Sequence, residues 1–299
     1  MFLTNSATHW KARVQTALLL AAALSLGACA NLGGTPPANA PTLSKERIAE
    51  IVNSPDRSAA DRNNDLRRKP ADMLAFIGMR PGMVAFDLST GGGYTTELLA
   101  RAVGPSGKAY GQSQPPRDPS APARPAVAPE GNAAPQVAPT PGAANAPPPV
   151  RRTSAQALAE RAKNPVVANI VSAVRKFEDP IPPELASGGL DLVTLMFDYH
   201  DLGHMGVDRA AMNRAVFAAL KPGGVYVLAD HAGRPGTGIS EAATLHRIEE
   251  AFLRQEIEAA GFRLVDQGQF LRNPNDPRDK NTPEPAQPKD EFVLKFVRP

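Results

Sequence analysis

The stretch Asp87-Leu88-Ser89-Thr90-Gly91-Gly92-Gly93-Tyr94 predicts the end of a strand, a glycine turn and the start of a helix. It follows the apolar run at 83–86 and precedes the helix-forming segment 95–100. Glycine lets the backbone turn sharply and approach a bulky ligand, and the free amide groups at the start of a helix point toward that ligand. The stretch therefore indicates a nucleotide-type cofactor pocket. An ordinary strand-to-helix turn is the alternative for this segment alone.

The residues around the turn argue against two common phosphate-binding loops. A dinucleotide fingerprint needs a third glycine where Thr96 stands, and the Gly-Lys-Ser/Thr of a phosphate-cradling loop is absent. S-adenosylmethionine carries a cationic ammonium and a cationic sulfonium and no phosphate, so the carboxylate of Asp87 suits it electrostatically. We therefore expect S-adenosylmethionine as the cofactor. The predicted cofactor-binding residues of this stretch are Asp87, Ser89, Thr90, Gly91, Gly92, Gly93 and Tyr94.

Helical and strand patterns alternate along the chain, which is typical of an α/β, Rossmann-like doubly wound sheet of about seven strands. Helices at the N-terminal end of the folded part precede the first strand. The predicted strands are 83–86, 108–111, 170–174, 190–197, 225–229, 262–265 and 292–296. The predicted helices are 44–52, one that starts at 54–55, then 70–78, 95–100, 154–162, 208–220 and 240–260.

Composition divides the chain. Proline occurs 31 times in 299 residues, about twice its usual share, and many of these residues fall at about 114–150, which has almost no large apolar side chain. Such a segment cannot bury enough surface to order itself, so we predict a disordered Pro/Ala-rich insertion within one folded domain at 43–299. The net charge of +3 is small and the basic residues are scattered, so we expect no nucleic-acid partner.

The N-terminal sequence has the pattern of a segment that is removed during export. Two basic residues precede the apolar run 14–26, which is short for a membrane span and typical of an export signal. Leu26-Gly27-Ala28-Cys29 resembles the lipobox of bacterial lipoproteins, and Cys29 is the sole cysteine. We predict a signal peptide at 1–28, lipidation at Cys29, a flexible tether at 29–42 and a place on the periplasmic face of a bacterial membrane. The alternative is a conventional signal peptide and a soluble periplasmic protein.

Several motifs together resemble class I S-adenosylmethionine-dependent methyltransferases. They are the stretch 87–94, Leu220-Lys221-Pro222-Gly223-Gly224 before a strand, and Ala260-Gly261-Phe262 before the last two strands. Closer matches resemble a bacterial group of exported predicted methyltransferases: Arg68-Lys69-Pro70, 93–99, Tyr199-His200-Asp201, Asp230-His231 and Leu271-Arg272-Asn273-Pro274. The resemblance covers roughly 44–299 without the insertion. It implies the class I fold and methyl transfer from S-adenosylmethionine.

The sequence departs from that family at two positions. Ser89 stands where the family has glycine, and Gly111-Gln112 replaces the acidic residue that binds the ribose hydroxyls. A glutamine can still form a hydrogen bond to a hydroxyl, without charge assistance, so Gln112 joins the predicted cofactor-binding residues. Near Phe177, the acidic residue that relatives use for adenine corresponds to Glu178 or Asp179.

Ligands of such sheets bind outside the carboxyl ends of the strands. This rule brings two groups to the pocket, Asp198-Tyr199-His200 and Asp230-His231. His200 is the first candidate for a general base and His231 the second, with Asp198 or Asp230 to orient the imidazole and Tyr199 to stack on adenine or substrate. A histidine at a strand end that only caps backbone groups is the alternative.

Two further polar residues receive structural interpretations. Asp201 is expected to cap the next turn or helix, and His246 to be solvated on a charged helix.

The leading function is methyl transfer from S-adenosylmethionine to a small molecule. Because S-adenosylmethionine is made in the cytoplasm, an exported protein meets little of it, and the runner-up is an exported binding module that keeps the fold with reduced or altered chemistry. The third hypothesis is a metal-dependent hydrolase with a metal site among His200, Asp201, His204 and Asp230-His231. Gly203 weakens helical presentation of the His200 and His204 pair, and our site prediction contains no metal ligand. No motif names the methyl acceptor or the oligomeric state.

Overall fold

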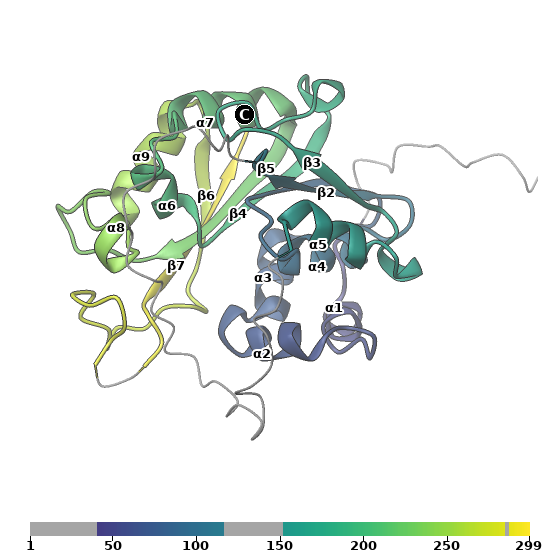
Figure 1. Ribbon diagram of the computed structural model, residues 1–299, viewed down its shortest axis with the longest axis horizontal. Coiled ribbons are helices and arrows are strands. Elements are labelled where there is room, and N and C mark those ends of the chain that lie inside the picture. Colours follow the sequence, from purple (N-terminus) through teal and green to yellow (C-terminus); the bar gives the residue numbers. More distant parts are fainter. Residues whose placement is uncertain (1–40, 117–151, 285–286) are drawn as a thin grey trace, which may run out of the picture. The chain divides into compact units, whose positions relative to one another are not determined.

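The strands of the protein form one mixed sheet, seen in the computed structural model (Figure 1). The structure describes residues 41–116, 152–284 and 287–299. The predicted signal peptide, Cys29, nearly all of the predicted tether and most of the predicted insertion lie outside the described residues. The described residues form one compact unit. Among the described residues, no helix is both long and apolar enough to cross a membrane.

The sheet has seven strands in the order β3-β2-β1-β4-β5-β7-β6. All neighbouring strands are parallel except β7, which pairs antiparallel with both β5 and β6. The order reverses between β1 and β4, which is the switch point where ligands bind in such sheets. The predicted doubly wound α/β fold is confirmed. The strands are β1 Val84–Leu88, β2 Lys108–Ser113, β3 Ile170–Val174, β4 Leu190–Met196, β5 Leu220–His231, β6 Arg263–Gly268 and β7 Glu291–Val297.

Helices cover both faces of the sheet. They are α1 Lys45–Val52, α2 Ala59–Arg68, α3 Pro70–Ile77, α4 Tyr94–Val103, α5 Ser154–Arg161, α6 Tyr199–His204, α7 Arg209–Ala219, α8 Ala242–Leu245 and α9 Glu250–Ala259, with short 3-10 turns at Pro165–Val167 and Pro183–Leu185. Successive side chains of a strand point to opposite faces. Phe86 packs in a core with residues of α6, α7 and α9, whereas its neighbour Ala85 packs in a second core with residues of α1, α3, α4 and α5.

The second helix begins later than the sequence indicates. We expected a cap at Ser54 with Pro55 in the first turn, but α2 starts at Ala59, and the Ser58 hydroxyl accepts the amide of Asp61 at 3.0 Å. Asp56 is instead bonded to Arg101 of α4, with 2.8 Å between the Arg101 Nη2 and Asp56 Oδ2 atoms. The chain 53–58 therefore forms a turn because its polar side chains bind a different helix.

The predicted long helix at 240–260 is wrong, because it is two helices with a break at 246–249. His246 adopts a left-handed backbone with a φ of +50°, which no continuing helix contains. Arg247 turns inward and is fully buried, and its guanidinium pairs with Asp276 at 2.9 Å and donates to the carbonyl of Ala232 at 2.9 Å. A buried charge needs such partners, and reaching them bends the backbone away from helical geometry.

Candidate functional site

A short turn joins β1 to α4, as the sequence predicts. The amide of Thr90 donates to the carbonyl of Gln112 at 2.9 Å, and the amide of Gly93 donates to the carbonyl of Thr90 at 2.8 Å. Gly91 and Gly93 have φ values of +52° and +82°, the region that suits glycine. No side chain in the described part of the chain caps the start of α4, so its first amides are available to a ligand at the turn. We name residues 89–93 the cofactor loop.

Asp87 lies at the end of β1 behind the cofactor loop and is 2% exposed. Its carboxylate accepts the hydroxyls of Thr96 at 2.7 Å and Thr194 at 2.8 Å. Burial raises the pKa of Asp87 to about 6, and these two hydroxyls oppose the rise. The carboxylate is therefore buried and fixed in direction, and the nearby charge of Arg68 also opposes the rise of its pKa. Thr194 was missed, because nothing in the strand pattern of 190–197 separates a bonded threonine from a packed one.

Ser89, which departs from the family pattern, has a left-handed backbone with a φ of +54°. Its hydroxyl donates to the carboxylate of Asp198, which lies just after β4. Burial raises the pKa of Asp198 to about 7, although this hydrogen bond opposes the rise. A glycine at this position would adopt the same backbone without cost but could not form that bond. The serine thus connects the cofactor loop to the end of the neighbouring strand.

Gln112 is fully buried at the end of β2, and both ends of its side-chain amide bind backbone. Its Oε1 atom accepts the amide of Ser89 at 2.9 Å and its Nε2 atom donates to the carbonyl of Arg175 at 2.7 Å. The glutamine fixes the cofactor loop against the end of β3. The next residue, Ser113, is 7% exposed, and its hydroxyl is without a hydrogen-bond partner among the described residues.

The two acidic residues predicted to bind adenine, Glu178 and Asp179, are more exposed than Gln112. Asp179 is exposed and paired with Arg175, and Glu178 is half-buried.

Gly111 precedes Gln112, and a Cβ atom there would lie 2.6 Å from Leu158 and 2.9 Å from Thr90. A glycine is required at that position because α5 and the cofactor loop approach the strand so closely.

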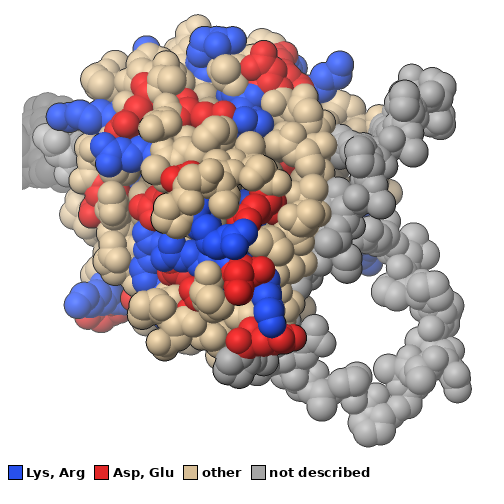
Figure 2. Space-filling model, turned by 90° about the vertical axis from the view of Figure 1, so that its left-hand side faces the viewer, with Lys and Arg blue, Asp and Glu red and all other residues tan. Residues whose placement is uncertain are grey.

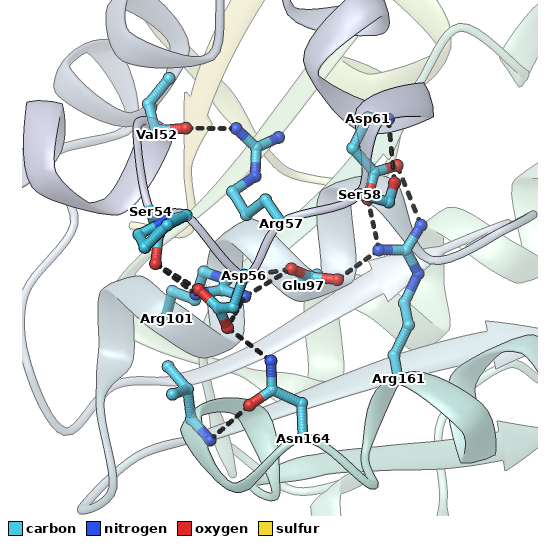
Figure 3. A network of polar contacts seen from close by, with 12 residues as sticks. Val52, Ser54, Asp56, Arg57, Ser58, Asp61, Glu97, Arg101, Arg161 and Asn164 are labelled. Carbon is cyan, nitrogen blue, oxygen red and sulfur yellow. Dashed lines mark hydrogen bonds and ion pairs between the residues drawn. The ribbon is translucent and has the colours of Figure 1, made fainter.

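A network of ion pairs joins α2, α4 and α5 (Figure 3), and one of its arginines also binds the cofactor loop. Arg161 at the end of α5 donates from Nε to the carbonyl of Gly92 at 2.7 Å, and its other nitrogens pair with Asp61 at 2.7 Å and with Glu97. Glu97 also pairs with Arg101 at 2.8 Å. Sequence reasoning missed Arg161, because it is separated from the loop by the whole Pro/Ala-rich segment.

Tyr94 is directed away from the loop toward α2. Its hydroxyl donates to Asp65 at 2.6 Å, and burial beside that carboxylate raises the pKa of Tyr94. The guanidinium of Arg68 lies 5.8 Å from the centre of the Tyr94 ring and 4.3 Å from that of Phe197. These rings help to line a small apolar pocket between α3, α4 and the end of β4. Its lining residues are Arg68, Pro70, Met73, Leu74, Ile77, Tyr94, Thr95, Leu98, Leu99, Met196 and Phe197.

The predicted catalytic residues differ in how accessible they are. Asp198 is partly exposed, whereas Tyr199, His200, Asp230 and His231 are at most 1% exposed. Tyr199 donates its hydroxyl to Glu256 of α9 at 2.8 Å and accepts from Asn213 of α7 at 2.9 Å. The structure contradicts a stacking role for Tyr199, because its ring belongs to the core between α6, α7 and α9.

His200 and Asp230 form a buried pair, with 2.6 Å between Nδ1 and Oδ1. Burial lowers the pKa of His200, but Asp230 and Asp201 outweigh it and raise the pKa to about 10. A raised pKa disfavours the role of general base for His200. His231 pairs with Glu291 at 3.0 Å. Of the predicted orienting groups, it is Asp230 that orients the His200 ring.

His246 is 5% exposed and contacts this pair, in contrast to the predicted solvated position. Its Nδ1 atom lies 3.3 Å from Nε2 of His200 and 3.2 Å from Oδ1 of Asp201. The helix break described above is what turns the ring inward. The carboxylate of Asp201 also lies in this cluster, because it faces the imidazoles of His200 and His246.

Charges of both signs are interspersed on the face of the molecule that Figure 2 shows. Lysine and arginine side chains lie beside aspartate and glutamate side chains there.

Comparison with known proteins identifies the fold. No family model and no curated protein matches the chain. Among solved structures, an S-adenosylmethionine-dependent methyltransferase from Aquifex aeolicus matches with a TM-score of 0.50 and 15% identity, over 86% of this chain and 100% of that one. The chain has the class I methyltransferase fold.

Two other similar structures are more distant. A TehB-like methyltransferase from Corynebacterium glutamicum matches with a TM-score of 0.44 and 11% identity, over 81% of this chain and 99% of that one. The fibrillarin of Aeropyrum pernix, solved with natively bound S-adenosylmethionine, matches with a TM-score of 0.40 and 16% identity, over 73% of this chain and 67% of that one.

Proposed function

We propose that this protein is an S-adenosylmethionine-dependent methyltransferase that acts on a small molecule. The observation that carries the proposal is the cofactor loop, which follows a strand at the switch point of the sheet, with the buried carboxylate of Asp87 behind it. A fixed carboxylate beside free helix amides suits a ligand that has both cationic and hydrogen-bond acceptor groups.

The residues present fit this cofactor. Asp87 and the cofactor loop would hold its amino acid part, and the free hydroxyl of Ser113 would bind a ribose hydroxyl at the end of β2. A buried hydroxyl without a partner costs free energy until a ligand pairs with it. Gln112 would support this site through the Ser89 amide rather than bind the cofactor through its side chain. When bound, the cofactor supplies the activated methyl group.

We propose Asp198 as the catalytic residue nearest to the acceptor. It is the partly exposed member of the predicted set, and the Ser89 hydroxyl fixes its direction beside the cofactor loop. Methyl transfer needs the nucleophile in line with the methyl group, so a fixed carboxylate that accepts a hydrogen bond from the acceptor favours that alignment. Asp230, His200 and His231 would act behind it as positioning residues.

The test is calorimetric titration of the full chain with S-adenosylmethionine. We compare the parent with Asp87→Asn, which keeps the size of the side chain, and with Asp266→Asn, which removes an exposed carboxylate on β6. We expect saturable binding in the parent, unchanged binding in Asp266→Asn, and affinity at least about tenfold lower in Asp87→Asn, because one charged contact contributes about 1.5–3 kcal/mol. A folded parent that binds no cofactor at high concentration overturns the proposal.

Export and a lipid anchor at Cys29 are part of this proposal, and they rest on the apolar run at 14–26 and the lipobox-like 26–29. We expect the protein in the membrane fraction of its bacterial host and Cys29→Ser in the soluble fraction or uncleaved, because a thiol is required for lipidation. Equal fractionation of both forms after the signal peptide has been removed from both contradicts the anchor. Neither a nucleic-acid partner nor an oligomer is part of the proposal.

A further inference from the structure

Three side chains from two separate segments converge beside the carboxyl ends of β4 and β5. His200 and Asp201 belong to α6, and His246 follows α8. The Nε2 atom of His200 lies 3.3 Å from Nδ1 of His246 and 3.2 Å from Oδ1 of Asp201, and the last two atoms are 3.2 Å apart. Each residue therefore directs one atom that can coordinate a metal ion at the same point.

The size of this triangle matches a tetrahedral zinc site. In a tetrahedral zinc site with bonds of about 2.0–2.1 Å, neighbouring ligand atoms lie roughly 3.3–3.4 Å apart. The three separations here are 3.2, 3.2 and 3.3 Å. Two imidazoles and one carboxylate favour zinc over magnesium or calcium, which prefer oxygen ligands alone.

A second layer of contacts orients the first ligand. Asp230 is fully buried, and its Oδ1 atom lies 2.6 Å from Nδ1 of His200, so that the opposite ring nitrogen, Nε2, faces the other two side chains. The other oxygen of Asp230 accepts the backbone amide of His200 at 2.9 Å. A carboxylate on the outer nitrogen of a histidine is the usual support of a zinc-binding imidazole.

The backbone at His246 is strained in a way that serves this convergence. A left-handed conformation is unfavourable for a non-glycine residue and persists where the surrounding structure fixes it. Here the ion pair between Arg247 and Asp276, at 2.9 Å, fixes the next residue. Such strain at a buried imidazole points to a functional requirement at that position.

We propose that His200, Asp201 and His246 bind one zinc ion through Nε2, Oδ1 and Nδ1. Asp201 is 27% exposed, so water reaches one side of the cluster, and three protein ligands with an open position are typical of a reactive zinc site. The proposal does not depend on methyl transfer, because its test measures metal binding alone. Without a metal ion, the same three atoms would form a hydrogen-bonded network centred on Asp201, and this is the outcome to exclude.

The experiment uses the full chain without a polyhistidine tag, freed of metal and titrated with zinc ion against a chromophoric chelator. We expect one equivalent to bind in the parent, with at least a hundredfold lower affinity in His246→Ala and Asp201→Asn. The exposed carboxylate variant Asp266→Asn is the matched control for Asp201→Asn and should bind as the parent does. No saturable binding, or equal binding in all four proteins as for an adventitious ion, overturns the proposal.

A measurement on the parent alone covers the case in which a variant does not fold. Cobalt(II) in place of zinc gives intense visible absorption in a tetrahedral site and weak absorption in an octahedral one. We expect the intense band at one equivalent of cobalt and its loss on addition of zinc. A weak octahedral spectrum, or none above that of free cobalt, contradicts the proposed site even if both ligand variants unfold.

Discussion

The cofactor loop and the cluster of His200, Asp201 and His246 lie at the same end of the sheet but are assembled differently. The loop is one continuous segment between β1 and α4, held in a left-handed backbone mainly by glycines. The cluster joins residues 46 positions apart and depends on a left-handed histidine and a buried arginine. A continuous segment tolerates changes elsewhere in the fold, whereas an assembled one depends on the packing that joins its parts.

The largest expected effect concerns the support of the assembled site. Arg247→Met removes the buried partner of Asp276, and breaking such a pair costs about 3–5 kcal/mol. We expect the free energy of unfolding, measured in urea, to fall by about that amount. Arg254→Met, which removes an exposed pair with Glu258, should change it by less than about 1 kcal/mol. Equal losses in the two variants contradict the dependence on a buried pair.

Two glycines test how the continuous segment is held. Gly93→Ala forces a side chain into a φ of +82° and puts its Cβ atom 2.9 Å from Leu158 and Arg161. We expect a loss of about 3 kcal/mol in stability, because strain and overpacking add.

Gly91→Ala is the matched variant, with a φ of +52° and nothing within 4 Å of its Cβ atom. It should cost about 1 kcal/mol, from backbone strain alone. Urea unfolding measures the loss of stability in both variants. Equal losses would contradict the difference between the crowded position of Gly93 and the open position of Gly91.

The buried carboxylate of Asp87 behind the cofactor loop should make the free energy of unfolding depend on pH. Its folded pKa of about 6 lies above its ordinary value of 3.8, so the protonated form favours folding. That contribution is fully present below about pH 4 and is lost as pH rises through 6. Asp87→Asn has no such loss, and the stability advantage of the variant over the cofactor-free parent should grow by about 1–2 kcal/mol between pH 5 and 8. An advantage independent of pH contradicts the raised pKa.

The smallest expected effect lies at the connection of the loop to β4. Ser89→Gly relieves a left-handed serine and removes the hydrogen bond to Asp198. These effects oppose each other, so we expect stability to change by less than about 1 kcal/mol. If Asp198 is catalytic, kcat should fall while the affinity for S-adenosylmethionine stays unchanged. A fall in affinity alone would assign Ser89 to cofactor binding instead.

The sequence predicted what local chemistry determines. The strand, turn and helix around Asp87 follow from adjacent residues, and all the predicted strands exist because apolar alternation reflects burial on the two faces. The predicted helix at 240–260 failed, because the inward turn of Arg247 depends on Asp276, 29 residues further along the chain. Arg161 and the free hydroxyl of Ser113 were missed for the same reason, since their roles arise only when distant segments pack together.

The Arg161 contact also bears on the Pro/Ala-rich segment that interrupts the domain. Gln112 precedes that segment and holds the amide of Ser89, and Arg161 follows it and holds the carbonyl of Gly92. The two flanks are thus fastened to opposite ends of the same cofactor loop. Whatever the length or composition of 117–151, the loop is fixed by what stands on either side of it, so a shortened version of the segment should be compatible with an intact site.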